Sequence, residues 1–148
     1  MLLGSGIIPE APSEEILVSG GGDGRILLWR IDPAQRGAIT SLYTLEDGRE
    51  EGESILSLVR EGSFLYSGRF DGEVNVWDLE TRQLVRSLKA TTGDVHTLTL
   101  GAGVLYAGGK TGVMQVSPLY CFVRTMTNID RNSTSITRPS RPSRHTTA

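Results

Sequence analysis

The sequence predicts an all-β protein built from four-stranded antiparallel sheets that repeat along the chain, and three observations lead to this prediction. Glycine is abundant, with 18 of 148 residues, against about 7% in ordinary proteins. Short apolar runs alternate with polar residues at the period that is typical of half-buried strands. Three segments align with one another without gaps. Many turns, short strands and an internal repeat together favour a repeating β architecture.

The three aligned segments are Ile16–Asp32, Phe64–Glu80 and Val104–Tyr120. Each begins with a short run of strand formers, continues through two glycines four residues apart, and ends in an alternating apolar run. The residue before the second glycine is Asp23, Asp71 or Thr111, so the repeats are spaced by 48 and then 40 residues. A turn residue followed by glycine predicts a hairpin, because glycine accepts a positive φ.

We expect each repeat to contain four strands, of which the aligned segment supplies the second and third. The first strands are expected at Leu2–Gly4, Ser54–Val59 and Asp94–Leu100. The fourth strands are expected at Thr40–Leu45, Gln83–Leu88 and Leu119–Val123. All of these runs are rich in residues that favour strands.

This unit resembles the WD40 repeat. The segment Leu65–Asp78 matches the second half of such a repeat and ends in its Trp-Asp pair, and Leu17–Trp29 matches nearly as well, with Arg30 in place of the aspartate. The resemblance implies a β-propeller, in which each four-stranded sheet is a blade packed face to face on the next. The expected fold class is therefore all-β, a partial WD40 β-propeller of about two and a half four-stranded antiparallel blades.

The resemblance also implies a structural signature in which Asp, Ser, His and Trp side chains form a hydrogen-bonded chain. The signature residues that match are Ser19, Asp23, Trp29, Ser67, Asp71, Trp77 and Asp78. The histidine is missing, because Ala90-Thr91 stands where Gly-His is expected and His96 falls after Val95. We therefore expect each aspartate to cap its own turn through backbone hydrogen bonds.

The predicted organisation is an incomplete propeller over residues 1–126, with repeats at about 1–45, 46–88 and 89–126. Residues 127–148 carry four arginines and one aspartate with little apolar content, which predicts a disordered basic tail. Propellers close with about 4–8 blades. The chain is therefore expected to be a fragment of a larger protein, to complete a ring with copies of itself through open blade edges, or to be completed by another chain.

No catalytic, cofactor or metal site is expected, because the chain has one cysteine, two histidines and no nucleotide loop. The glycine-rich segment Gly20–Gly24 leads into a strand and is interpreted as a hairpin turn. The acidic segment Glu46–Glu53 is interpreted as a solvated loop, the alternative being contact with a basic partner or a cation. Arg69 and Phe70 are candidate partner contacts, on the hypothesis that an exposed arginine lies beside an aromatic ring in a turn.

The predicted function is a non-catalytic protein–protein interaction or scaffold module with unidentified protein partners. The alternative is a hydrolase subunit that lacks its metallopeptidase part here, because Leu65–Arg86 is similar to the WD40 region of fungal glutathione-degrading dipeptidase-like subunits. A formal net charge of −2 argues against nucleic acid as a partner. No apolar run reaches the roughly 18 residues that cross a membrane. The absence of a signal peptide pattern predicts a cytoplasmic location, with the nucleus as an alternative.

Overall fold

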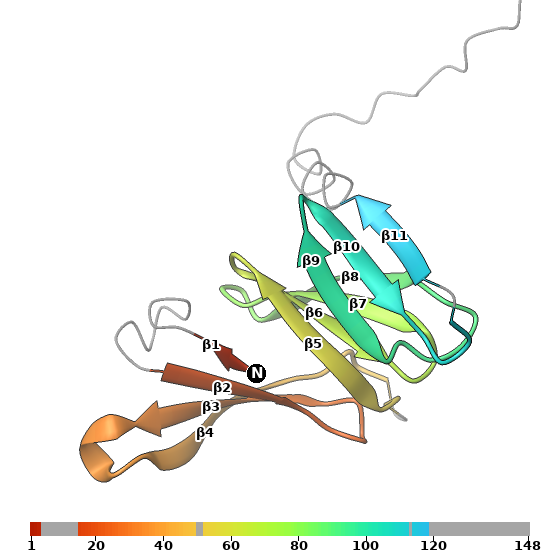
Figure 1. Ribbon diagram of the computed structural model, residues 1–148. Coiled ribbons are helices and arrows are strands. Elements are labelled where there is room, and N and C mark those ends of the chain that lie inside the picture. The colour runs from red at the N-terminus through yellow and green to blue at the C-terminus, as the bar shows by residue number, and fades with distance from the viewer. Residues whose placement is uncertain (4–14, 50–51, 113, 119–148) are drawn as a thin grey trace, which may run out of the picture.

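The computed structural model describes residues 1–3, 15–49, 52–112 and 114–118, and within these the strands form three antiparallel sheets (Figure 1). Strands β1–β4 form the sheet called blade 1, β5–β8 form blade 2 and β9–β11 form blade 3. In each sheet, strands that follow one another along the chain are neighbours. The predicted fold class, a partial β-propeller of antiparallel blades, is confirmed.

Blade 1 contains β1 (Leu2–Leu3), β2 (Glu15–Gly20), β3 (Ile26–Asp32) and β4 (Ala38–Leu45), with the 3-10 turn η1 (Pro33–Gln35) before β4. Blade 2 contains β5 (Ile55–Glu61), β6 (Phe64–Arg69), β7 (Glu73–Asp78) and β8 (Gln83–Lys89). Blade 3 contains β9 (Thr97–Gly101), β10 (Val104–Gly108) and β11 (Met114–Pro118). The predicted strand Leu119–Val123 and the predicted tail at 127–148 lie outside the described residues.

The hairpin registers repeat from blade to blade, because the aligned segments have the same spacing. Leu17 lies opposite Trp29 in blade 1, and Leu65 lies opposite Trp77 in blade 2. In blade 3 the equivalent Leu105 lies opposite Ser117. Residues paired in this way share one face of a sheet, so each blade presents equivalent positions on equivalent faces.

The predicted strand at Asp94–Leu100 is wrong in its first part, because β9 begins only at Thr97. Two residues before it are fixed instead by hydrogen bonds to the ends of β6 and β10. The amide of Val95 donates to the carbonyl of Arg69 at 2.9 Å, and the amide of His96 donates to the carbonyl of Gly108 at 2.9 Å. These two hydrogen bonds therefore tie the segment before β9 to both blade 2 and blade 3.

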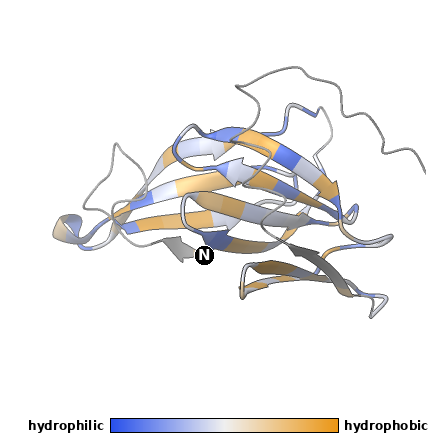
Figure 2. Cartoon of the chain, turned by 90° about the horizontal axis from the view of Figure 1, so that it is seen from above, coloured by the Kyte–Doolittle hydropathy of each residue, from blue (hydrophilic) through white to orange (hydrophobic). Residues whose placement is uncertain are grey.

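Two hydrophobic clusters hold the blades together, one at each junction between neighbouring sheets. The cluster between blades 1 and 2 contains Ile16, Val18, Ile26, Leu28, Leu45, Leu65, Trp77 and Leu79. The cluster between blades 2 and 3 contains Tyr66, Val74, Val76, Val95, Leu98, Leu105 and Ala107. Figure 2 shows hydrophobic and hydrophilic residues alternating along the strands. Burying one large apolar side chain contributes about 1.5–3 kcal/mol, so each junction is a substantial source of stability.

Burial differs between the blades in a way that follows from their neighbours. In β2 the buried residues alternate with half-buried or exposed ones, as expected for a sheet covered on one face. In β6 every residue from Leu65 to Arg69 is buried, because blade 2 is covered on both faces. Blade 2 is therefore the centre of the described structure.

Candidate protein-interaction face

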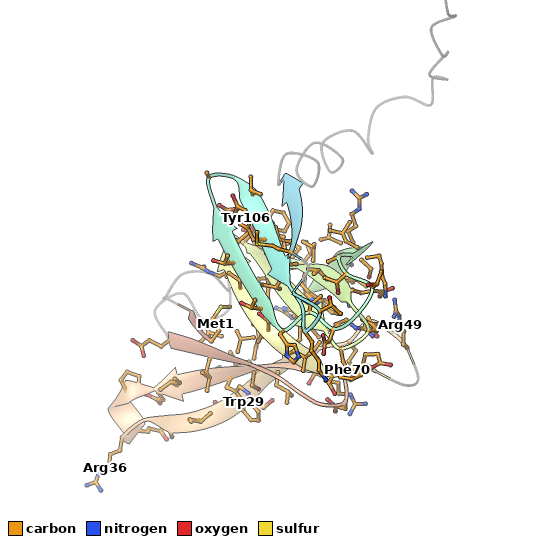
Figure 3. The ribbon with its side chains drawn as sticks, turned by 45° about the vertical axis from the view of Figure 1, so that its right-hand side comes forward. Met1, Trp29, Arg36, Arg49, Phe70 and Tyr106 are labelled. Atoms are coloured by element: carbon orange, nitrogen blue, oxygen red, sulfur yellow. The ribbon has the colours of Figure 1, made fainter. Side chains whose placement is uncertain are left out.

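Turns and interblade loops gather at one end of the blades, and we call this end the turn face. It comprises the turns at 21–25, 70–72 and 109–112 and the described loop residues at 46–49, 52–54 and 90–96. In Figure 3, Arg49 and Phe70 lie at this end, whereas Arg36 lies away from it, in the β3–β4 connection. Of the two candidate partner contacts, Phe70 belongs to this face and Arg69 is the last residue of β6, directly before it.

The loop between blades 1 and 2 is bonded to turns of both blades. The hydroxyl of Ser54 donates to the carbonyl of Gly22 at 3.0 Å, and the amide of Ile55 donates to the carbonyl of Gly21 at 3.0 Å. On the other side, the amide of Phe70 donates to the carbonyl of Ser54 at 2.9 Å. These hydrogen bonds fix the turn face as a single surface rather than a set of independent loops.

The loop between blades 2 and 3 is bonded in a similar way. The amides of Ala90 and Thr91 both donate to the carbonyl of Gly72, at 2.9 and 3.1 Å. Gly72 has φ of +84°, and a Cβ at this position would lie 2.1 Å from the carbonyl oxygen of Gly93. Glycine is therefore required there both by the backbone conformation and by the close approach of the loop.

The Trp and Ser members of the signature are hydrogen-bonded in both blades. The indole Nε1 of Trp77 donates to the hydroxyl of Ser67 at 3.0 Å, and that of Trp29 donates to Ser19 at 2.9 Å. Trp77 is buried whereas Trp29 is half-buried. The pair is thus a structural link between the second and third strands.

The aspartates of the signature cap turns. The carboxylate of Asp71 accepts a hydrogen bond from the amide of Glu73 at 3.0 Å, and Asp23 accepts one from Arg25 at 3.2 Å. Asp78 caps the next turn in the same way, with the amide of Glu80 donating at 2.9 Å. Local caps of this kind are the expected behaviour of aspartate in turns.

Thr91 and Asp94 make hydrogen bonds in the loop that leads into blade 3. Thr91, at the position expected for histidine, is buried, and its hydroxyl lies within hydrogen-bond distance of the carbonyls of Gly93 and Asp94. The turn of blade 3 has Thr111 in place of the aspartate, and its Lys110 amide donates instead to the carboxylate of Asp94 at 3.0 Å. The other oxygen of Asp94 lies 2.9 Å from the exposed His96.

The expectation that Arg69 is exposed is wrong, because only 1% of its side chain is accessible. Its guanidinium forms an ion pair with Asp47 of the interblade loop, and it lies 3.3 Å from the carboxylate of Asp71. The interblade loop folds over the end of β6 and covers the arginine. Arg69 therefore holds the turn face together and is not available to a partner.

Arg49 extends this arrangement outward. It lies 2.9 Å from Glu73 and 3.6 Å from Asp71, and 44% of its side chain is accessible. We call these five residues the charge cluster: Asp47, Arg49, Arg69, Asp71 and Glu73. The interpretation of Glu46–Glu53 as a solvated loop is thus wrong for Asp47, whose side chain is only 8% accessible. Its partner Arg69 is 22 residues away, and no local sequence pattern links the two.

The pKa of Asp47 records this environment. Burial alone would raise the pKa, but hydrogen bonds from the amide of Arg49 and from the guanidinium of Arg69 outweigh burial, so the pKa lies below the ordinary value of 3.8. The pKa of Arg49 is raised, chiefly by its hydrogen bond to Glu73. These contacts therefore favour the ionised forms of Asp47 and Arg49.

A polar cavity of about 400 Å³ opens on the turn face beside the charge cluster, lined by Asp23, Gly24, Arg25, Glu46, Asp47, Arg49 and Gly52. Its lining carries three carboxylates and two guanidinium groups, and Arg25 lies 3.0 Å from Glu46. Among the described residues, no cluster of His, Cys, Asp and Glu side chains is arranged to hold a metal ion. That part of the chain also has no helix with the length and apolar character that a bilayer crossing requires.

Phe70 remains as the exposed apolar residue of the turn face. Of its surface, 57% is accessible, although its amide is fixed by the bond to Ser54. The following residue, Asp71, belongs to the charge cluster, so the ring lies at the border of a polar surface. An exposed aromatic side chain on a rigid backbone, surrounded by polar groups, is the arrangement typical of a contact hot spot.

Comparison with known proteins agrees with this architecture. Residues 39–78 match the family described as WD40, "WD domain, G-beta repeat". The chain is 28% identical over 100 residues to the "Probable di- and tripeptidase DUG2" of Saccharomyces cerevisiae, covering 67% of this chain and 11% of that protein. It is also 28% identical over 102 residues to the "Anaphase-promoting complex subunit cdh1" of Dictyostelium discoideum, covering 69% of this chain and 13% of that protein. The chain thus spans only a small part of the length of either relative.

A solved structure also resembles the chain. The computationally designed Ika4 protein superimposes with a TM-score of 0.57 and 30% sequence identity, covering 70% of this chain and 60% of that chain. The names of the two relatives point to different functions, so the likeness identifies the repeat and leaves the activity open.

Proposed function

The chain belongs to the WD40 repeat family, and from this premise we propose that it is a non-catalytic protein–protein interaction module with scaffold character whose turn face is the contact surface. Repeats of this family supply rigid sheets with turns at their ends, and function resides in the residues carried by those turns. In this chain the interblade loops are bonded to the turns, so the face is ordered before a partner arrives. Binding then costs little ordering entropy.

The observation that carries the proposal is the exposure of Phe70 on a fixed backbone. A large apolar ring with 57% of its surface accessible gains free energy when a partner covers it. The neighbouring charge cluster is internally paired, and it supplies a polar border that orients a partner. The expected partner therefore offers an apolar pocket with a polar rim.

The test compares Phe70→Ser with the matched control Ile39→Ser. Ile39 lies in β4 and is 56% accessible, so both changes remove an equally exposed apolar side chain. We expect proteins captured by the wild-type chain to lose about 30-fold or more in affinity for the Phe70 variant, the effect of a hot spot of about 2 kcal/mol. The Ile39 variant should retain them. Equal retention by both variants would overturn the assignment of the turn face.

A second candidate is that these blades form the non-catalytic portion of a peptidase subunit. The similarity to a protein named as a probable di- and tripeptidase favours it. On this hypothesis the purified chain does not hydrolyse dipeptides with or without zinc, but the proteins captured with it do. Hydrolysis by the purified chain itself would contradict both candidates. Two further predictions remain: a cytoplasmic or nuclear location, and association of the chain with copies of itself.

A further inference from the structure

Each blade has two faces with different partners. We call the face that packs on the next blade along the chain its leading face, and the opposite one its trailing face. In blade 1 the leading face carries Ile16, Val18, Ile26 and Leu28, which pack against the trailing residues Leu65, Trp77 and Leu79 of blade 2. In blade 2 the leading face carries Tyr66, Val74 and Val76, which pack against the trailing residues Leu105 and Ala107 of blade 3.

The hairpin registers assign the remaining faces. Leu17 opposite Trp29 is equivalent to Leu65 opposite Trp77, so these two residues lie on the trailing face of blade 1. Gly108 opposite Met114 is equivalent to Gly68 opposite Val74, so Met114 lies on the leading face of blade 3, as does Tyr106. In the described structure neither of these faces is covered by another sheet.

Residues on these two open faces are more accessible than their equivalents in blade 2, as expected where no sheet covers the face. Among the trailing residues, Trp77 is 1% accessible, whereas its equivalent Trp29 is half-buried. Among the leading residues, Val74 is fully buried, whereas its equivalent Met114 is 61% accessible. The side chains themselves remain apolar. Each open face therefore has the composition of an interior one.

The two open faces are of opposite kinds. The trailing face of blade 1 retains the Trp–Ser link that blade 2 also carries, with distances of 2.9 and 3.0 Å. In blade 2 the equivalent trailing face packs against the leading face of blade 1. The leading face that is left open in the described structure belongs to blade 3. We propose that the leading face of blade 3 of one copy packs on the trailing face of blade 1 of a second copy, so that the contact between copies repeats the contact between neighbouring blades.

Such a contact is head-to-tail, because two different surfaces meet. Two copies joined by two such contacts would close a ring from the three described sheets of each, and the resulting six lie within the range of about 4–8 in which propellers close. The contact involves the faces of the sheets and not the edges of their strands. It does not involve Phe70, so it is independent of the proposed partner surface.

The test uses the full chain and blocks one face at a time. Leu17→Glu places a negative charge on the trailing face, and Met114→Glu places one on the leading face. Leu27→Glu, on the same trailing face, is the second variant if Leu17→Glu unfolds. Mass in solution is measured by light scattering and analytical ultracentrifugation, and folding by circular dichroism. We expect the wild type to form a dimer and each single variant to be monomeric.

The mixture of the two variants gives the sharpest result. One variant retains an intact leading face and the other an intact trailing face, so a 1:1 mixture should form a heterodimer with a single contact. Its dissociation constant should exceed that of the wild type by at least tenfold. A monomeric wild type, a dimer that survives both charges, or a mixture that stays monomeric would each overturn the proposal. A Phe70→Ser chain should still dimerise, which separates this test from that of the turn face.

Discussion

Replacing Arg69 with methionine is expected to destabilise the chain strongly, because Arg69 is the buried member of the charge cluster. Its side chain is 1% accessible, and the carboxylates of Asp47 and Asp71 that it neutralises are 8% and 23% accessible. Removing one partner from a buried ion pair costs about 3–5 kcal/mol, since a charge is left without compensation. Arg49 stays 3.5 Å from Asp47 and 3.6 Å from Asp71, which places the expected loss near the lower end, at about 3 kcal/mol.

The matched control is Arg49→Met. This arginine touches the same two carboxylates, but 44% of its side chain is accessible, so solvent and salt screen its ion pairs. We expect a loss of under about 1 kcal/mol. Urea unfolding followed by circular dichroism and tryptophan fluorescence measures both values. If Arg69→Met costs no more than Arg49→Met, the burial of Arg69 and its role beneath the interblade loop are refuted.

Three further predictions concern single contacts, each measured as the free energy of unfolding in urea. Because the pKa of Asp47 is depressed, its contribution to stability is present above the unfolded pKa of about 3.9 and is lost as pH falls through the lower folded pKa. Asp47→Asn should therefore flatten the loss of stability below about pH 4. An unchanged pH dependence would contradict this. Ser67→Ala should cost about 1–3 kcal/mol, because it leaves the buried indole N–H of Trp77 without an acceptor. Ser19→Ala, measured on monomer, should cost under about 0.5 kcal/mol, because its partner Trp29 is half-buried. Equal costs would count against this difference in burial between the two tryptophans. Gly72→Ala should prevent stable docking of the loop between blades 2 and 3, since its Cβ would meet a carbonyl oxygen at 2.1 Å. Gly112→Ala, with φ of +75° and no atom within 4 Å, should cost only about 1 kcal/mol of backbone strain. A similar cost at both sites would refute the close approach.

The strands were predictable because their signals are local. Period-two alternation and turn glycines predict β2, β3, β6 and β7, and the gapless repeat predicts that their registers are equivalent. The start of β9 was not predictable in this way. Val95 is apolar and looks like a strand residue, but it is placed by a hydrogen bond to the carbonyl of Arg69 in another blade.

The candidate site was predictable only in part, because burial depends on which loop covers which residue. Phe70 is exposed as the contact hypothesis requires, but the adjacent Arg69 is buried. The signal for the difference lies in the acidic segment before β5, which places Asp47 over the end of β6. Nothing in the sequence near Arg69 reveals that contact, since the two residues are brought together only when blades 1 and 2 pack.

The most direct test of the turn face as a partner surface is site-specific photo-crosslinking. A benzophenone side chain replaces Phe70 in one chain and Ile39 in another, both at positions that are more than half accessible. The chains are irradiated in the presence of candidate partners and the adducts are identified by mass spectrometry. The proposed function predicts a protein adduct at Phe70 that is absent at Ile39. The same adducts at both positions, or none at Phe70, would contradict it.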